Sequence, residues 1–381
     1  MSRPTPHSKY TSIARIVSNF KRFFFEALDY LVEHLIGAQY TIEIPSADSA
    51  PGASSLLARL CPDTLHVRLA PMYFSADLNW RRLGVVPLRA SSAGPNVGLT
   101  PSELRAAKGA AVHSAAIGVC GKHGWPFPSE AYNPLLRAAE DVVARVMSEM
   151  PCVAQHATSD EGTRTTAECV AYQFAVRDTA RPGNGAFSTV HADNVYCDDA
   201  LRDFTPELHR AMNSGLGGVA QLEHKLQEGG GSCSHRDVTL LQVARGTKRM
   251  VRSFNLWILI EDAGRDAPLC FAELGARWQD DGQKWEATDG PCAHETAMAN
   301  VASARAYDVS SKCGTRTLKR EVLSRVTYRA CSGSMQPGDA YIFETWGPTA
   351  AYHAGVERAH RRRFGPRARR LSVEVRVALV L

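Results

Sequence analysis

The residue pattern with the clearest chemistry is a histidine followed two positions later by an aspartate, His191 and Asp193. On an extended chain, side chains at this spacing leave the same face, about 6–7 Å apart at their Cα atoms. An imidazole and a carboxylate that converge in this way supply two of the three ligands of the facial triad that binds non-haem iron(II). This pair is therefore the first candidate for a metal site.

The spacing alone is not specific, because 13 histidines and 39 acidic residues in 381 positions give about 1.3 such pairs by chance. A second pair occurs at His235 and Asp237. His191 follows a β-type run at 187–190, whereas His235 follows a glycine-rich turn and begins a helical pattern. We therefore expect Asp237 at the start of a helix, and the metal ligands at His191 and Asp193.

A third ligand has to come from a later strand. A turn at 337–339 leads into a β-type run at 340–343, and His353 follows ten residues after that run. His360 is the alternative, but it lies in the stretch 358–370, which holds seven arginines and would be a poor surrounding for a neutral imidazole ligand. The sequence predicts His353 as the third ligand.

The segment 370–377 alternates polar and apolar residues, with the polar side chains of Arg370, Ser372, Glu374 and Arg376 on one face. Arg370 and Ser372 lie about 7 Å apart on that face, and a guanidinium beside a hydroxyl is suited to binding one carboxylate. Arg376 lies roughly 20 Å further along the strand and cannot join the same grip. Either arginine can therefore be the one that binds a carboxylate. An ordinary sheet with one solvated face would show the same alternation of polar and apolar residues.

Taken in order, these motifs resemble the iron(II)/2-oxoglutarate-dependent oxygenases. The resemblance rests on His191-x-Asp193, the later His353, and Arg370-x-Ser372 on the closing strand. It implies a double-stranded β-helix (jelly-roll) core in which the first three residues bind iron(II). It also implies that Arg370 with Ser372, or else Arg376, binds 2-oxoglutarate, with dioxygen as the further cosubstrate.

Within that superfamily, three segments resemble the gibberellin-desaturase-like and cephalosporin-methoxylase-like oxygenases of natural-product chemistry. They are Phe-Asn-Leu-Trp at 254–257, Ala-Pro-Leu at 267–269 and Leu-Ser-Val-Glu-Val-Arg at 371–376. The resemblance covers about 170–381, and Ile258 stands where the family usually has arginine. It implies hydroxylation or desaturation of a small substrate. The residues expected to line the substrate pocket are Phe254, Asn255, Trp257, Trp346 and Tyr352.

The elements that position these residues change in character along the chain. Amphipathic helical patterns occupy 12–38 and 134–150, and short β-type runs begin after about 168, interrupted by a helical pattern at 201–245. These patterns predict an α+β fold: a helical and loop region at 1–165 packs outside a jelly-roll or barrel core at 166–381.

Composition narrows the function classes. A hydrophobic content of 44% excludes wholesale disorder, and a net charge of +5 is too small for a general nucleic-acid binder. None of the ten cysteines forms a C-x-x-C pair, which disfavours a structural zinc site, and no apolar run is long enough to span a bilayer. We expect a cytoplasmic protein with a small-molecule substrate; the acid-free, basic segment 1–25 leaves organelle targeting as an alternative.

Two other functions remain open at the level of sequence. A metal-free jelly-roll protein could hold His191 and Asp193 as a simple hydrogen-bonded pair while binding a small ligand. The arginine-rich stretch 358–370 could bind nucleic acid, although such stretches are more often solvated loops. The oligomeric state is not predicted.

Overall fold

The structure is a computed structural model, and its described residues fall into several ranges. They are 39–44, 64–90, 98–118, 121–125, 127, 129–150, 153, 167–179, 188–193, 234–261, 267–274, 276–278, 285–287, 293–303, 306–310, 315–331, 335–347, 349–358 and 370–381. The predicted helix at 12–38, the basic segment 1–25, the part of the helical insertion at 201–233, and His360 lie outside them.

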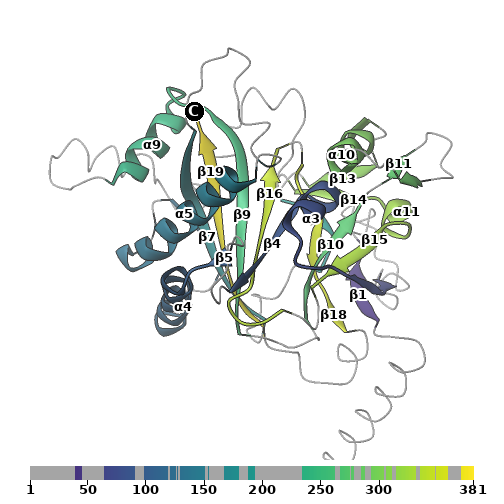
Figure 1. Ribbon diagram of the computed structural model, residues 1–381, viewed down its shortest axis with the longest axis horizontal. Helices are drawn as coiled ribbons and strands as arrows, with labels where there is room; N and C mark the ends of the chain where they lie inside the picture. Colours follow the sequence, from purple (N-terminus) through teal and green to yellow (C-terminus); the bar gives the residue numbers. More distant parts are fainter. Residues whose placement is uncertain are drawn as a thin grey trace, which may run out of the picture.

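Two seven-stranded sheets form the body of the protein (Figure 1). Sheet I has the order β5 (Gly98–Leu99), β4 (Val85–Ala90), β16 (Ala340–Trp346), β9 (Met250–Glu261), β19 (Leu371–Val380), β7 (Glu168–Asp178), β6 (Gly121–Gly124). Sheet II has the order β13 (Tyr307–Ser310), β14 (Thr315–Leu318), β8 (His191–Ala192), β17 (His353–Gly355), β10 (Leu269–Glu273), β15 (Thr327–Ala330), β3 (Leu69–Pro71). Their strand pairs are antiparallel except β15 with β3 and β4 with β5.

Smaller sheets and helices complete the described part of the chain. The smaller sheets join β18 (Glu357–Arg358), β1 (Tyr40–Glu43) and β2 (Thr64–Val67), and separately β11 (Ala276–Trp278) and β12 (Trp285–Ala287). The helices are α3 (Ala76–Leu83), α4 (Pro101–Ala116), the 3-10 helix η1 (Glu130–Tyr132), α5 (Asn133–Glu149), α9 (His235–Ala244), α10 (Ala293–Ser303) and α11 (Arg320–Leu323). None of the helices in these ranges is long and apolar enough to cross a membrane.

The two faces of each sheet bury different cores because successive strand residues point to opposite sides. On β9, Leu256 and Ile258 pack with the apolar faces of α4 and α5, which cover the outside of sheet I. Trp257 and Leu259 point the other way and pack against Phe271 of sheet II. The outer face of sheet II is covered by α10 and α11. The two sheets therefore face each other, and side chains of both fill the space between them.

The α+β prediction is confirmed, and helices α4 and α5 lie on the outer face of sheet I. The region 1–165 differs from the prediction in one respect, since it also supplies strands to both sheets: β3, β4, β5 and β6. These strands gave little sequence signal. Strand β4 contains Pro87 and runs buried from Val85 to Leu88, so it lacks the polar and apolar alternation by which a strand is recognised.

Candidate metal centre

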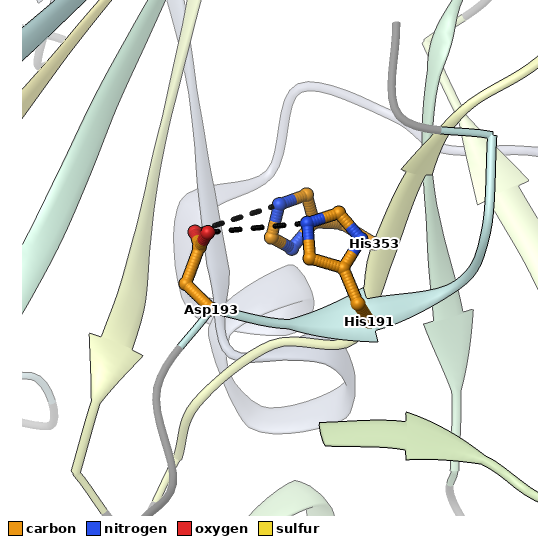
Figure 2. Close-up of side chains that lie close together, drawn as sticks. All are labelled: His191, Asp193 and His353. Atoms are coloured by element: carbon orange, nitrogen blue, oxygen red, sulfur yellow. Dashed lines mark ion pairs between the residues drawn. The ribbon is translucent and has the colours of Figure 1, made fainter. Parts of the chain in front are cut away.

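The structure brings together His191, Asp193 and His353 in the space between the sheets (Figure 2). His191 and His353 are direct partners on adjacent strands β8 and β17, and Asp193 follows the end of β8. Nε2 of His191 lies 3.9 Å from Oδ1 of Asp193, and Nε2 of His353 lies 3.7 Å from Oδ2. All three residues are buried, with 6–8% of their surface exposed. Whether they bind a metal stays a prediction, but the donor set and its convergence fit one.

Hydrogen bonds to the backbone orient both imidazoles. Nδ1 of His191 lies 2.8 Å from the carbonyl oxygen of Thr189, and Nδ1 of His353 lies 3.0 Å from that of Ala351. Because a carbonyl oxygen can only accept, each Nδ1 carries the proton, and each Nε2 presents a lone pair toward Asp193. This is the arrangement by which metal-binding histidines are commonly held, with the second ring nitrogen fixed by an outer partner.

A buried polar network holds the chain segment that leads to His353. Glu344, at the end of β16, accepts hydrogen bonds from the Thr349 amide at 2.6 Å and pairs with the buried Arg252 of β9. The backbone of Glu344 also accepts from the Ala351 amide at 3.0 Å. A Cβ atom at Gly347 would lie 2.0 Å from Oε1 of Glu344, so glycine is needed for this close approach. The segment before His353 is thereby fixed.

The buried His294 of α10 also contacts this segment: its Nε2 lies 3.2 Å from the Thr349 carbonyl oxygen. Burial lowers the pKa of His294 to about 4, because the charged imidazole would lose its hydration. The unfolded chain therefore takes up this proton first on acidification. The contribution of neutral His294 to the free energy of unfolding is fully present above about pH 6.5 and is lost as the pH falls toward 4.

We expect His294 to make the free energy of unfolding fall by up to about 1.4 kcal/mol per pH unit between pH 6.5 and pH 4. Urea unfolding at a series of pH values measures this slope. His294→Gln cannot titrate and should show a shallower slope over the same interval. An identical slope in both proteins would show that other groups govern the acid sensitivity.

Arg376 of β19 reaches across from sheet I to the candidate ligands. Its Nη2 donates a short hydrogen bond to Oδ1 of Asp193, and Arg376 is 7% exposed. Burial alone would lower the pKa of Arg376, but the carboxylate of Asp193, with Tyr172 and Glu374, raises it above its ordinary value. Arg376 thus stays charged and is paired with a ligand of the candidate metal site.

Arg370 directly precedes the same strand and has different surroundings. It is 4% exposed, its Nη1 donates to the carbonyl oxygen of Ala267 at 2.8 Å, and its guanidinium lies 5.6 Å from the centre of the Trp257 ring. Burial lowers the pKa of Arg370 to about 10. Three buried polar atoms here have no hydrogen-bond partner among the described residues: Nε of Arg370, Oγ of Ser372 and Nε1 of Trp257. Buried polar atoms of this kind can be satisfied by a bound ligand, ion or water.

Comparison with known proteins adds no family. No family model matches the sequence, and no curated protein matches it. Three solved structures of an iron and alpha-ketoglutarate-dependent endoperoxidase, NvfI, match 90% of this chain and 95–96% of theirs, with TM-scores of 0.42, 0.42 and 0.40 and identities of 13%, 13% and 14%. At these TM-scores and identities we draw neither family nor function from the likeness.

Two of the residues expected to line a pocket, Phe254 and Tyr352, lie in cores on the outer faces of the two sheets and not between them. Phe254 lies in the core between sheet I and the helices, 6.5 Å from the ring of Trp80. Tyr352 precedes His353 and so faces the opposite side of sheet II, in the core beneath α10 and α11. In both cases the neighbouring residue faces inward, because side chains alternate along a strand.

The other three expected pocket residues, Asn255, Trp257 and Trp346, are also buried. Trp257 faces sheet II and stacks with Tyr341 at 5.5 Å. Asn255 is the direct partner of Arg376 on the next strand, is 2% exposed, and its Oδ1 lacks a hydrogen-bond partner among the described residues. Trp346 packs with Trp125 and α9 in a separate apolar cluster, where it supports the end of the sheet.

Sequence reasoning did not single out Tyr172 and Gln173 of β7. Gln173 is paired with Arg376, and an irregularity in the register follows, between Arg376 and Val377 of β19. Such a bulge re-aims side chains beside it. The hydroxyl of Tyr172 lies 2.7 Å from that of Ser253 on β9. Nothing in the local sequence marks a bulge of this kind, so the two residues could not be found by pattern.

The second histidine and aspartate pair lies apart from this group, on α9. Asp237 forms a capping box with Ser234 at the start of the helix and accepts a hydrogen bond from Nε1 of Trp125 at 2.6 Å. The side chain of His235 is 78% exposed. The expectation that Asp237 begins a helix is confirmed.

Proposed function

We propose that this chain is a non-haem iron(II)- and 2-oxoglutarate-dependent oxygenase that hydroxylates or desaturates a small, natural-product-like substrate. The observation that carries the proposal is the buried group of His191, Asp193 and His353. Its two Nε2 lone pairs face one carboxylate, and two histidines with one carboxylate are the ligand set of the iron(II) facial triad. Iron and 2-oxoglutarate together would supply the oxidation of an unreactive C–H bond by dioxygen.

The protein's part in this chemistry is to bind, orient and exclude water. His191, Asp193 and His353 would hold the metal between the sheets. Arg370, whose buried guanidinium lies near the Trp257 ring, would bind the carboxylate at the far end of 2-oxoglutarate, together with the Ser372 hydroxyl, which has no hydrogen-bond partner among the described residues. No carboxylate of the described residues forms an ion pair with this buried guanidinium, which favours an anionic ligand, because buried charges are normally paired.

The fold we propose for this site is the double-stranded β-helix. The support for it is a pair of mostly antiparallel seven-stranded sheets, facing each other, with the candidate site between them. Helices α4 and α5 then cover the outside of one sheet and support β19, which carries Arg376 and directly follows Arg370. We propose a cytoplasmic location and no nucleic-acid partner.

Two observations favour the oxygenase over its rivals. Nε2 of His353 and Nε2 of His191 lie 3.7 and 3.9 Å from Asp193, which is beyond hydrogen-bond distance. This orientation fits a metal ion bound by all three side chains better than a simple hydrogen-bonded pair. Arg370, the last arginine of the stretch 358–370, is buried and is not available to a nucleic-acid surface. The arginines at 361–369 lie outside the described residues.

Anaerobic titration tests the proposal. We expect one iron(II) per chain, and a visible charge-transfer band that appears only when iron(II) and 2-oxoglutarate are both present. His191→Ala should lose the band, while the matched surface variant His235→Ala should keep it. If neither iron(II) nor 2-oxoglutarate stabilises the wild-type protein against heat, and no band forms, the oxygenase proposal is wrong.

A further inference from the structure

An ion pair between Arg252 of β9 and Glu344 of β16 lies buried on the outer face of sheet I, with side chains that are 1% and 0% exposed. Glu344 is the direct cross-strand partner of Phe254, which belongs to the apolar core between sheet I and the helices. The guanidinium of Arg252 lies 4.9 Å from the centre of the Phe254 ring and 5.8 Å from that of Trp80. A buried ion pair loses so much hydration that apolar side chains of similar size often stabilise a core equally well or better. The contacts of this pair therefore indicate its role better than stability does.

The carboxylate of Glu344 gathers three hydrogen-bond donors. Arg252 donates from Nε to Oε1, and Thr349 donates to Oε2 from both its amide and its hydroxyl. The Thr349 hydroxyl also accepts from Nη2 of Arg252 at 3.2 Å. A carboxylate offers only acceptors, whereas the amide of a glutamine would turn its own donor group toward one of these partners. Both members of the ion pair are thus bonded to Thr349.

Thr349 belongs to the connection from β16 in sheet I to β17 in sheet II, which leads to His353. Glu344 holds this connection a second time, because its backbone oxygen accepts from the Ala351 amide at 3.0 Å. The carbonyl oxygen of Ala351 in turn lies 3.0 Å from Nδ1 of His353. Figure 2 shows the imidazole that results, turned toward Asp193. A continuous series of hydrogen bonds therefore joins the ion pair to the orientation of one candidate metal ligand.

The other end of this series reaches the helical region of the chain. Nη1 of Arg252 donates to the carbonyl oxygen of Val153, which follows the end of α5. Buried networks of charged hydrogen bonds are directional and fix the groups that they join. The segment after α5 is therefore tied to the connection between the sheets.

From these contacts we propose that Arg252 and Glu344 are positioning residues for His353. The pair fixes the connection between the sheets, so that the Ala351 carbonyl oxygen holds the imidazole with Nε2 toward Asp193. The proposal rests on the proposed function and extends the candidate metal centre to residues on the opposite face of sheet I. It also gives the region before residue 165 a part in metal binding.

Thr349 offers the mildest test, because its hydroxyl can be removed while the ion pair stays. Thr349→Val loses the donor to Glu344 and the acceptor for Arg252. We expect the dissociation constant for cobalt(II), a spectroscopic substitute for iron(II), to rise about 10- to 100-fold, as for other outer partners of metal ligands. The visible absorption of bound cobalt(II) should change as well, because the imidazole is held less firmly. Thr349→Ser keeps the hydroxyl and should restore both the affinity and the spectrum.

The matched control is Thr239→Val on α9. Thr239 is also 0% exposed, and its hydroxyl also donates to a glutamate, Glu168, at 3.0 Å. Urea unfolding should show a loss of stability in both valine variants, since each removes a buried hydrogen bond. Only Thr349→Val should change cobalt(II) binding. Thr349→Ala, which removes the same hydroxyl without placing a second methyl group beside the charges, is the test protein if the valine variant does not fold.

The proposal is wrong if the wild type binds cobalt(II) and Thr349→Val binds it with the wild-type spectrum and an affinity within about 3-fold, well below the usual effect of an outer partner. If the wild type binds neither cobalt(II) nor iron(II), the proposed function fails instead. Nitrogen-15 NMR of the metal-free proteins then decides about the positioning. A proton fixed on Nδ1 of His353 in the wild type and in Thr349→Ser, but a mixture of tautomers in Thr349→Val, supports it. The same single tautomer in all three proteins overturns it.

Discussion

Replacement of His353 by alanine is expected to weaken iron(II) binding and 2-oxoglutarate turnover by more than about 100-fold, the upper end of what changes to outer partners of metal ligands cost. His353 supplies one of two imidazole nitrogens that face Asp193, and the described residues place no other histidine beside them. Metal titration and 2-oxoglutarate consumption measure the two losses.

The fold of this variant should persist, with a change in the free energy of unfolding in the range common for single substitutions, about 0.5–3 kcal/mol. The imidazole packs on Phe343 at a ring distance of 4.6 Å, and its Nε2 faces Asp193 at 3.7 Å. His235→Ala, on exposed α9, is the control and should leave both metal binding and turnover unchanged. Retained turnover in His353→Ala together with its loss in His360→Ala would move the third ligand to His360.

Arg370→Gln is expected to raise the apparent KM for 2-oxoglutarate by an amount that corresponds to about 2–5 kcal/mol, the usual cost of removing one partner of a buried charged pair. Arg370→Lys should have a smaller but clear effect, because an ammonium lacks the planar fork that binds a carboxylate through two hydrogen bonds. Steady-state kinetics with varied 2-oxoglutarate at saturating substrate measures both.

Arg370→Gln should leave the stability of the cosubstrate-free protein unchanged or increased. Burial lowers the pKa of Arg370 to about 10, which corresponds to roughly 3 kcal/mol of unfavourable charge burial. Removal of that charge offsets the lost hydrogen bond to Ala267. Arg177→Gln is the control, since Arg177 lies opposite Ser372 on β7 but is partly exposed and pairs with Glu374 at 3.6 Å. An unchanged KM for 2-oxoglutarate in Arg370→Gln, with a large rise in Arg376→Ala, would move the anchor to Arg376.

Much of the candidate site could be predicted because its residues follow short-range rules. The period of two along a strand placed Arg370 and Ser372 on one face, and the strand before His353 indicated where a third ligand would fall. Phe254 and Tyr352 were chosen for their aromatic type alone, without the side of the strand on which each lies, and both belong to outer cores. Each lies one residue from an inward-facing neighbour.

Long-range contacts were beyond the reach of sequence patterns. Arg376 and Asp193 are 183 positions apart, and their hydrogen bond exists only because sheets I and II face each other. The strands of the region before residue 165 were missed for a related reason. Strand β4 is defined by its pairing with β16, more than 240 positions later, and not by its own composition.

The central position of β19 has a consequence for how the protein is made. This strand follows every other described strand in the chain, yet it lies between β9 and β7, with which it forms its longest pairings. During synthesis, β7 and β9 therefore cannot be joined until β19 has been made. Until then, the edge of each of these two strands that will pair with β19 exposes unpaired backbone groups. Such late, long-range pairing slows folding and leaves intermediates prone to aggregation. Since β19 carries Arg376 and directly follows Arg370, the nascent chain should complete its candidate site and sheet I in the same final step.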